Sequence, residues 1–259
     1  MESICRWTLA MASSRRRLDQ ELVAQGFFAT PQEAMRAVMA GDVSGPGFRY
    51  RSAGTQVKVG CELHVRVQKA HVGRGALKLE GALDSFSIDP SGLACMDVGC
   101  STGGFTEVLL DRGAASVLAV DVGYAQFDWR LRNDPRVCLL ERTNILQVPT
   151  LKPKGSIDLA VCDVSFTSVT SVLGAIDEML CERSALVVLV KPQFEVAKEL
   201  VGEGGIVTDE AARAEAVEKV SHALVERGFR ICGVEESPIT GTKGNHEYLL
   251  WAQKGHQPL

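Results

Sequence analysis

The sequence predicts an α/β protein whose larger part is a doubly wound parallel sheet, preceded by a small α+β module. From residue 93 onward, short apolar runs alternate with helical segments, as in buried parallel strands joined by helices. Before residue 70, two helical patterns give way to apolar residues at every second position. The 259 residues are 46% hydrophobic and 23% charged, which is typical of a globular chain long enough for a large domain with a small attachment.

Two short helices are expected within residues 15–42. The first ends near Gly26, and its apolar stripe is Leu18, Leu22, Val23 and Phe27. The second has Thr30 as its N-cap, Pro31 at its first position and Glu33 placed for a capping box. It ends at Gly41, and its buried stripe is expected to be Ala34, Ala37, Val38 and Met39. A small sheet follows, with period-two apolar positions at Val57, Val59, Leu63, Val65 and Val67.

The larger part begins with a strand at residue 93. Strands are expected at residues 93–98, 117–122, 137–140, 157–162 and 186–190. Helices are expected at residues 105–112 and, with a long amphipathic pattern, at residues 209–227. Two last strands, 229–235 and 247–251, are separated by a connection rich in proline and glycine, which predicts an antiparallel hairpin at the edge of the sheet.

Charge is distributed unevenly along the chain. The formal net charge is −4, but residues 1–70 carry +4 and residues 71–259 carry −8. A basic small part before an acidic large part favours contact of the small part with a polyanion, although +4 over seventy residues also fits an ordinary surface.

The eight cysteines include no C-x-x-C pair, so neither a zinc site nor a disulfide framework is expected and no metal is predicted. No apolar run approaches the ~18–20 residues of a membrane span, and no secretory signal is evident, so a cytoplasmic protein without a membrane partner is expected.

A glycine-rich loop runs from Asp97 to Gly104, between a predicted strand and a predicted helix. Gly99, Gly103 and Gly104 allow a ligand to approach the backbone closely, and the helix start offers unpaired N–H groups. Asp121, at the end of the next strand, is placed to accept the hydroxyls of a ribose. The loop therefore predicts a cofactor that contains a nucleoside, without separating NAD from S-adenosylmethionine (SAM). The C-terminal hairpin favours SAM.

Longer motifs carry a resemblance to a known family. They are, in chain order, Arg74-Gly-Ala-Leu-Lys78-Leu-Glu-Gly-Ala-Leu83, Asp97-Val-Gly-Cys-Ser-Thr-Gly-Gly-Phe-Thr106, Asp121-Val-Gly-Tyr124, Glu141-Arg-Thr-Asn144, Asp163-Val-Ser-Phe166, Lys191-Pro-Gln-Phe-Glu195, Gly204-Gly-Ile-Val207, Ser237-Pro-Ile-Thr-Gly241 and Gly244-Asn-His-Glu-Tyr248. Upstream, Arg17-Leu-Asp19, Leu22-Val23 and Gly41-Asp-Val43 look like the S4 RNA-binding module. From about residue 15 to 253 the chain resembles the TlyA family, also called the haemolysin A family.

The resemblance implies a Rossmann-like class I SAM-dependent methyltransferase of the FtsJ type, with a seven-stranded, mostly parallel sheet and an antiparallel C-terminal hairpin. It divides the chain into an S4-like domain at residues 15–70, a linker and the start of the catalytic domain at 71–92, and a methyltransferase domain at 93–254. The implied reaction is methyl transfer to the ribose 2′-hydroxyl of a cytidine in 23S ribosomal RNA, and in some members in 16S ribosomal RNA as well. Ribosomal RNA or ribosomal subunits are the implied partners, and no obligate protein partner is expected.

Four residues are the implied catalytic set: Lys78, Asp163, Lys191 and Glu247. A ribose hydroxyl holds its proton tightly, so a base must lie close to it in line with the methyl donor. Lys191 is the candidate base, with Lys78 as the second cation that favours its neutral form and steers phosphate or hydroxyl. Asp163 is expected to orient Lys191, and Glu247 to fix the ribose or a lysine. Each of the four, taken alone, also fits an ordinary surface, turn or cap residue.

The remaining expected contacts fall into two groups. The cofactor-binding residues are expected to be Asp97, Gly99, Ser101, Thr102, Gly103, Gly104, Phe105, Asp121, Asn144 and Asp163. The RNA-binding residues are expected to be Arg15, Arg16, Arg17, Arg36 and Arg74.

Three alternative functions stay open: an S4-type RNA-binding protein without catalysis, a pore-forming haemolysin and a base methyltransferase. The haemolysin lacks an export signal and an amphipathic basic helix in the sequence, and the base methyltransferase lacks a Pro-Cys nucleophile or an Asp/Asn-Pro-Pro-aromatic pocket.

Overall fold

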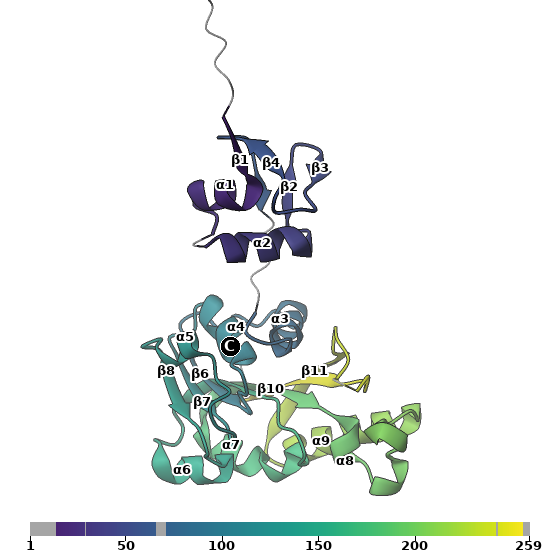
Figure 1. Cartoon of the computed structure of the whole chain (residues 1–259). Helices are drawn as coiled ribbons and strands as arrows, with labels where there is room; N and C mark the ends of the chain where they lie inside the picture. Colours follow the sequence, from purple (N-terminus) through teal and green to yellow (C-terminus); the bar gives the residue numbers. More distant parts are fainter. Residues whose placement is uncertain (1–13, 29, 66–70, 242, 256–259) are drawn as a thin grey trace, which may run out of the picture. The chain divides into compact units, whose positions relative to one another are not determined.

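A computed structural model of the chain describes residues 14–28, 30–65, 71–241 and 243–255. The chain divides into two compact units, Met1–Ala70 and His71–Leu259 (Figure 1). Each unit has its own hydrophobic core. Within the described ranges, no helix is both long enough and apolar enough to cross a bilayer.

The smaller unit packs two helices against short antiparallel strands (Figure 1). Its elements are β1 (Arg15–Arg17), α1 (Leu18–Ala24), α2 (Pro31–Ala40), β2 (Val43–Gly45), β3 (Phe48–Arg49), β4 (Gln56–Lys58) and β5 (His64–Val65). β1 pairs with β4, and β3, β2 and β5 form a second sheet in that order. The buried residues of this unit are Leu18, Leu22, Ala34, Val38, Val43, Ala53, Val57 and Leu63.

The predicted caps of α2 are confirmed, whereas part of the predicted helical stripes is wrong. The Thr30 side chain accepts a hydrogen bond from the Glu33 N–H at 3.3 Å, the Glu33 side chain bonds back to the Thr30 N–H, and the helix ends at left-handed Gly41. Phe27 is 42% exposed because α1 already ends at Ala24, and Met39 is 75% exposed because it lies about a quarter turn from the buried stripe. Residues 15–17, expected in the first helical region, form strand β1 instead.

The larger unit contains a seven-stranded sheet in the order β11-β12-β10-β9-β6-β7-β8. Its strands are β6 (Ala94–Val98), β7 (Ser116–Val120), β8 (Val137–Leu140), β9 (Ile157–Cys162), β10 (Leu180–Val190), β11 (Phe229–Glu236) and β12 (Tyr248–Lys254). Strands β6 to β10 pair in parallel, and β12 pairs antiparallel with both β10 and β11. This confirms the predicted parallel sheet with an antiparallel hairpin at its edge.

Helices cover both faces of this sheet (Figure 1). One face packs against α3 (Gly75–Ser85), α4 (Gly104–Asp111) and α5 (Trp129–Arg132), and the other against α6 (Val148–Leu151), α7 (Leu173–Met179) and α9 (Glu210–Val225). Successive β9 residues alternate between the two cores: Leu159 and Val161 face one, and Ala160 and Cys162 face the other. Burial on both faces explains why these strands appear in the sequence as continuous apolar runs.

The long predicted helix is present as α9. Asp209 caps it, accepting a hydrogen bond from the Ala211 N–H at 2.8 Å. Its buried stripe recurs every four residues at Ala212, Ala216, Val220 and Leu224. Four shorter helical segments complete the unit: η1 (Ile145–Gln147), η2 (Val169–Ser171), η3 (Lys198–Leu200) and η4 (Glu203–Gly205), with α8 (Pro192–Glu195) following β10.

Candidate active site

A cleft of about 690 Å³ opens at the carboxyl ends of the parallel strands in the larger unit. Its lining comes from residues of the segment that begins α3, the glycine loop after β6, the loops after β9 and β10, and the connection that precedes β12. This is the edge at which open α/β sheets bind ligands, and the volume is that of a small-molecule site.

The glycine loop forms one wall of the cleft with its backbone. Gly99 has φ +84°, and a Cβ atom there would lie 2.5 Å from the Asp163 carbonyl oxygen, so no side chain fits. Gly103, with φ +98°, is the N-cap of α4, and Gly104 begins that helix. The loop therefore presents a helix N-terminus and bare backbone to a ligand, as a phosphate- or carboxylate-bearing group requires.

Two aspartates, Asp121 and Asp97, stabilise the glycine loop through hydrogen bonds to Ser101 and Thr106. The Asp121 carboxylate accepts hydrogen bonds from the Ser101 N–H at 2.8 Å and the Gly123 N–H at 2.6 Å. Asp97 is fully buried, and its Oδ2 atom accepts from the Thr106 hydroxyl at 2.7 Å, while Oδ1 has no hydrogen-bond partner among the described residues. Burial raises the pKa of Asp97 to about 7, and nearby carboxylates add to the effect.

Lys191 and Asp163 form the first ion pair of the cleft. Lys191 follows β10 directly and is 8% exposed, and Asp163 follows β9. The Lys191 ammonium lies against the Asp163 carboxylate and also donates to the Ser165 hydroxyl at 2.7 Å. Adjacent parallel strands thus bring both side chains to one point, as their places in the sequence indicated.

Lys78 and Glu247 form the second ion pair. Lys78 Nζ donates to Glu247 Oε2 at 2.5 Å, and both side chains are almost fully buried. Lys78 comes from α3 and Glu247 from the residue before β12, 169 positions apart in the chain. All four predicted catalytic residues therefore line one cleft, arranged as two lysine–carboxylate pairs.

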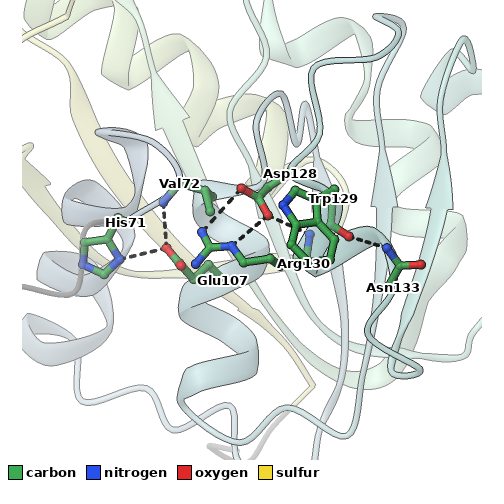
Figure 2. Close-up of polar contacts among 7 residues, drawn as sticks. All are labelled: His71, Val72, Glu107, Asp128, Trp129, Arg130 and Asn133. Carbon is green, nitrogen blue, oxygen red and sulfur yellow. Dashed lines mark hydrogen bonds and ion pairs between the residues drawn. The ribbon is translucent and has the colours of Figure 1, made fainter. Parts of the chain in front are cut away.

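Glu107 of α4 anchors the chain segment that leads into the cleft (Figure 2). Its Oε2 atom accepts from the Val72 N–H at 3.0 Å and lies 3.0 Å from His71 Nδ1, while His71 Nε2 lies 3.2 Å from Glu80. The next residue, Gly73, lines the cleft, and a Cβ there would lie 2.5 Å from the Thr102 hydroxyl. These contacts set the start of α3 against the glycine loop.

The other predicted residues are distributed unevenly. Six of them also line the cleft: Arg74, Gly99, Ser101, Thr102, Gly104 and Phe105. Asp97, Gly103 and Asp121 lie around it without forming its lining, and Asn144 is exposed, its side chain capping η1 by accepting from the Leu146 N–H at 3.0 Å. In the smaller unit, Arg15 and Arg36 are exposed, whereas Arg16 pairs with Glu21 at 2.8 Å and Arg17 with Asp19 at 2.6 Å.

Two further residues that line the cleft, Phe166 and Asn245, were not predicted from the sequence. Phe166 is 92% exposed at the lining of the cleft, has φ +64° and touches the ring of Phe194, with centroids 5.6 Å apart. Asn245 is buried and joins two cleft loops, accepting from the Val207 N–H at 3.0 Å and donating to the Gly205 carbonyl at 2.8 Å. Both belong to motifs noted in the sequence, but no sequence signal indicated the exposure of one or the burial of the other.

Fold and site together define a Rossmann-like methyltransferase. Residues 71–254 match the family described as FtsJ-like methyltransferase. A solved S-adenosylmethionine-dependent methyltransferase from Mesorhizobium loti shares the fold, with a TM-score of 0.51 and 18% identity over 70% of this chain and 99% of that one.

Closer relatives define the family. The 16S/23S rRNA (cytidine-2′-O)-methyltransferase TlyA of Mycobacterium tuberculosis is 47% identical over 239 residues, which are 92% of this chain and 89% of that protein. A solved structure from Streptococcus thermophilus, described as a candidate hemolysin, has a TM-score of 0.70 and 39% identity over 95% of this chain and 91% of its own. The chain belongs to the TlyA family of FtsJ-like methyltransferases.

Proposed function

We propose that this protein transfers the methyl group of SAM to the ribose 2′-hydroxyl of a cytidine in ribosomal RNA. The observation that carries the proposal is the convergence of two lysine–carboxylate pairs in one cleft beside the glycine loop. The name of the 47% identical mycobacterial relative supports the same reaction and the same nucleotide. A ribosomal RNA substrate also implies that the protein works in the cytoplasm.

The chemistry of the cleft fits SAM as cofactor. Within the part of the chain that the structure describes, the buried Asp97 Oδ1 atom has no hydrogen-bond partner, and an ammonium group of a ligand would supply one. Bare backbone at Gly99 admits a ligand that a side chain would exclude. We assign cofactor binding to Asp97, Gly99, Ser101, Thr102, Gly103, Gly104, Phe105, Asp121, Asn144 and Asp163. When bound, SAM supplies an electrophilic methyl group and a positive charge.

Lys191 is the proposed base for the 2′-hydroxyl. The neutral amine accepts the hydroxyl proton, and Asp163 and Ser165 hold the nitrogen in place for that transfer. Lys78, fixed by Glu247, supplies a positively charged group that steers the substrate hydroxyl or phosphate.

Recognition of the RNA involves both units in this proposal. The exposed Phe166 ring at the cleft offers a surface on which an unstacked base can lie. Arg74 at the same cleft is exposed and suits a phosphate contact. We infer that residues 15–70 form an S4-like RNA-binding domain, and that residues 71–92 link it to a methyltransferase domain at 93–254. In the small domain, the arginines that contact RNA in this proposal are Arg15, Arg16, Arg17 and Arg36. Ribosomal subunits are the proposed form of the substrate, with 23S RNA as the first target and 16S RNA as a second.

Transfer of labelled methyl from SAM to ribosomal subunits that lack the modification tests the proposal. Wild type and Lys191→Ala are compared, with SAM binding measured for both. Label in 2′-O-methylcytidine with wild type, lost with the variant while SAM still binds, supports the reaction and the base. Equal label with both proteins would rule out Lys191 as the base, and bound SAM without label on either subunit would rule out ribosomal RNA as the substrate.

A further inference from the structure

Two loops meet beside the proposed base, and three contacts join them. One loop, residues 163–171, follows β9, and the other, residues 191–196, follows β10. At the near end, Lys191 joins Asp163 and Ser165. In the middle, the rings of Phe166 and Phe194 are in contact, with centroids 5.6 Å apart and planes at 50°.

Glu195 forms the third contact, at the far end. This residue is 5% exposed, and its Oε1 atom accepts from the Val169 N–H at 2.6 Å. Its Oε2 atom accepts from the Ser168 hydroxyl at 2.5 Å and lies 3.3 Å from the ammonium of Lys219 in α9. Lys219 also donates to the Glu195 carbonyl at 2.6 Å. Charge-assisted bonds of this kind are short and strong, and a buried carboxylate with several donors makes a stiff link.

The 163–171 loop contains a strained residue, and the Glu195 contacts hold it in that conformation. Phe166 has φ +64°, a strained conformation for a residue with a Cβ, which persists only where the surroundings impose it. The loop is fixed at Asp163 by the β9 backbone, whose continuation donates from the Asp163 N–H to the Val98 carbonyl at 2.9 Å. Glu195 fixes it again at Ser168 and Val169, so the strained segment is held from both sides.

We propose that Glu195 is a positioning residue for methyl transfer, acting through the 163–171 loop to set Asp163 and Phe166 against Lys191. This rests on the proposed function only for its kinetic consequence, because the link itself is a property of the fold. Glu195 does not line the cleft, so it acts without touching the substrate or the cofactor.

Glu195→Gln tests this with little change in shape. The amide keeps one acceptor oxygen for three donors and places an NH₂ group among them, so the link weakens. We expect kcat for methyl transfer to fall about 10- to 100-fold, the range that a misplacement of about 1 Å produces, while the number of SAM sites per chain, measured at saturating SAM, stays unchanged. Hydrogen exchange of residues 163–171 should become faster in the same variant. Asp158→Asn is the matched control, because that carboxylate also ties two segments of this unit, accepting from the Ala94 N–H at 2.9 Å, but at the opposite edge of the sheet.

The outcomes separate positioning from a general structural role. A wild-type kcat in Glu195→Gln, or a fall that only matches the loss of SAM sites, would overturn the proposal, as would an equal fall in Asp158→Asn. If Glu195→Gln does not fold, Ser168→Ala removes one bond of the link, and an unchanged kcat there overturns the proposal. If wild type methylates no ribosomal RNA, the proposed function fails by itself. Hydrogen exchange in Glu195→Gln then tests by itself whether Glu195 holds the 163–171 loop in place. Faster exchange at residues 163–171 supports this role, and unchanged exchange refutes it.

Discussion

The buried carboxylate of Asp97 is expected to make the stability of the catalytic unit depend on pH in a defined direction. The side chain is 0% exposed at the end of β6, and removal from water raises its pKa from 3.8 to about 7. Between these two values the folded protein holds the proton and the unfolded chain releases it. Stability from this group is therefore fully present below pH 3.8 and is lost as the pH rises through 7.

The size of the effect follows from the two pKa values. One pKa unit corresponds to 1.36 kcal/mol, so the whole shift amounts to about 4 kcal/mol and the part lost between pH 5 and pH 8 to about 2.5 kcal/mol. Asparagine does not titrate, so Asp97→Asn removes this dependence. The amide also changes the contact with Thr106, but that change adds a constant offset and no slope.

Urea unfolding of full-length wild type and Asp97→Asn at pH 5, 6, 7 and 8, followed by tryptophan fluorescence, measures the difference. The free energy of unfolding of the variant minus that of wild type should rise by about 2.5 kcal/mol across the series. Thr106→Val removes the hydroxyl that lowers the pKa of Asp97, so in that variant the loss of stability should continue to higher pH. Parallel curves for wild type and Asp97→Asn would refute the reasoning.

Three further predictions concern the cleft. Lys78→Met leaves the Glu247 carboxylate buried without its Lys78 partner and should lower the free energy of unfolding by about 3–5 kcal/mol, and adding Glu247→Gln should recover most of that loss. A Lys78→Met variant as stable as wild type contradicts this prediction. Phe166→Ala removes a stacking surface worth about 1–3 kcal/mol per base, so kcat/KM for RNA should fall while SAM affinity, measured by calorimetry, stays constant; unchanged RNA kinetics would exclude stacking. Gly99→Ala puts a methyl group 2.5 Å from the Asp163 carbonyl at φ +84°, so SAM affinity and thermal stability should both drop, and normal SAM binding would show that the loop tolerates a side chain.

Local signals predicted their elements well. The capping box at Thr30 and the helix end at Gly41 each depend on residues a few positions apart, and each is present in the structure. Strand and helix alternation likewise predicted the parallel sheet, because burial on both faces leaves a plain apolar pattern in the sequence. Strand lengths were less predictable: β10 begins at Leu180, six residues before its apolar run.

Long-range relations could not be predicted from composition or spacing. The pairing of Lys78 with Glu247 crosses 169 positions, and only family resemblance placed both in one site. The left-handed backbone of Phe166 and the burial of Glu195 depend on neighbours that other segments supply. Glu247 was expected to fix the ribose or a lysine, and the structure pairs it with Lys78.

The place of β12 in the sheet has a consequence for biosynthesis. Of the strands in the described residues it is the last along the chain, yet it lies between β10 and β11, so β11 has no neighbour to pair with in the sheet until β12 has been made. Glu247 stands at its beginning and completes the pair with Lys78. A chain still emerging from the ribosome therefore lacks both an interior strand and one carboxylate of the cleft, and the site can form only after synthesis of the catalytic unit is nearly finished.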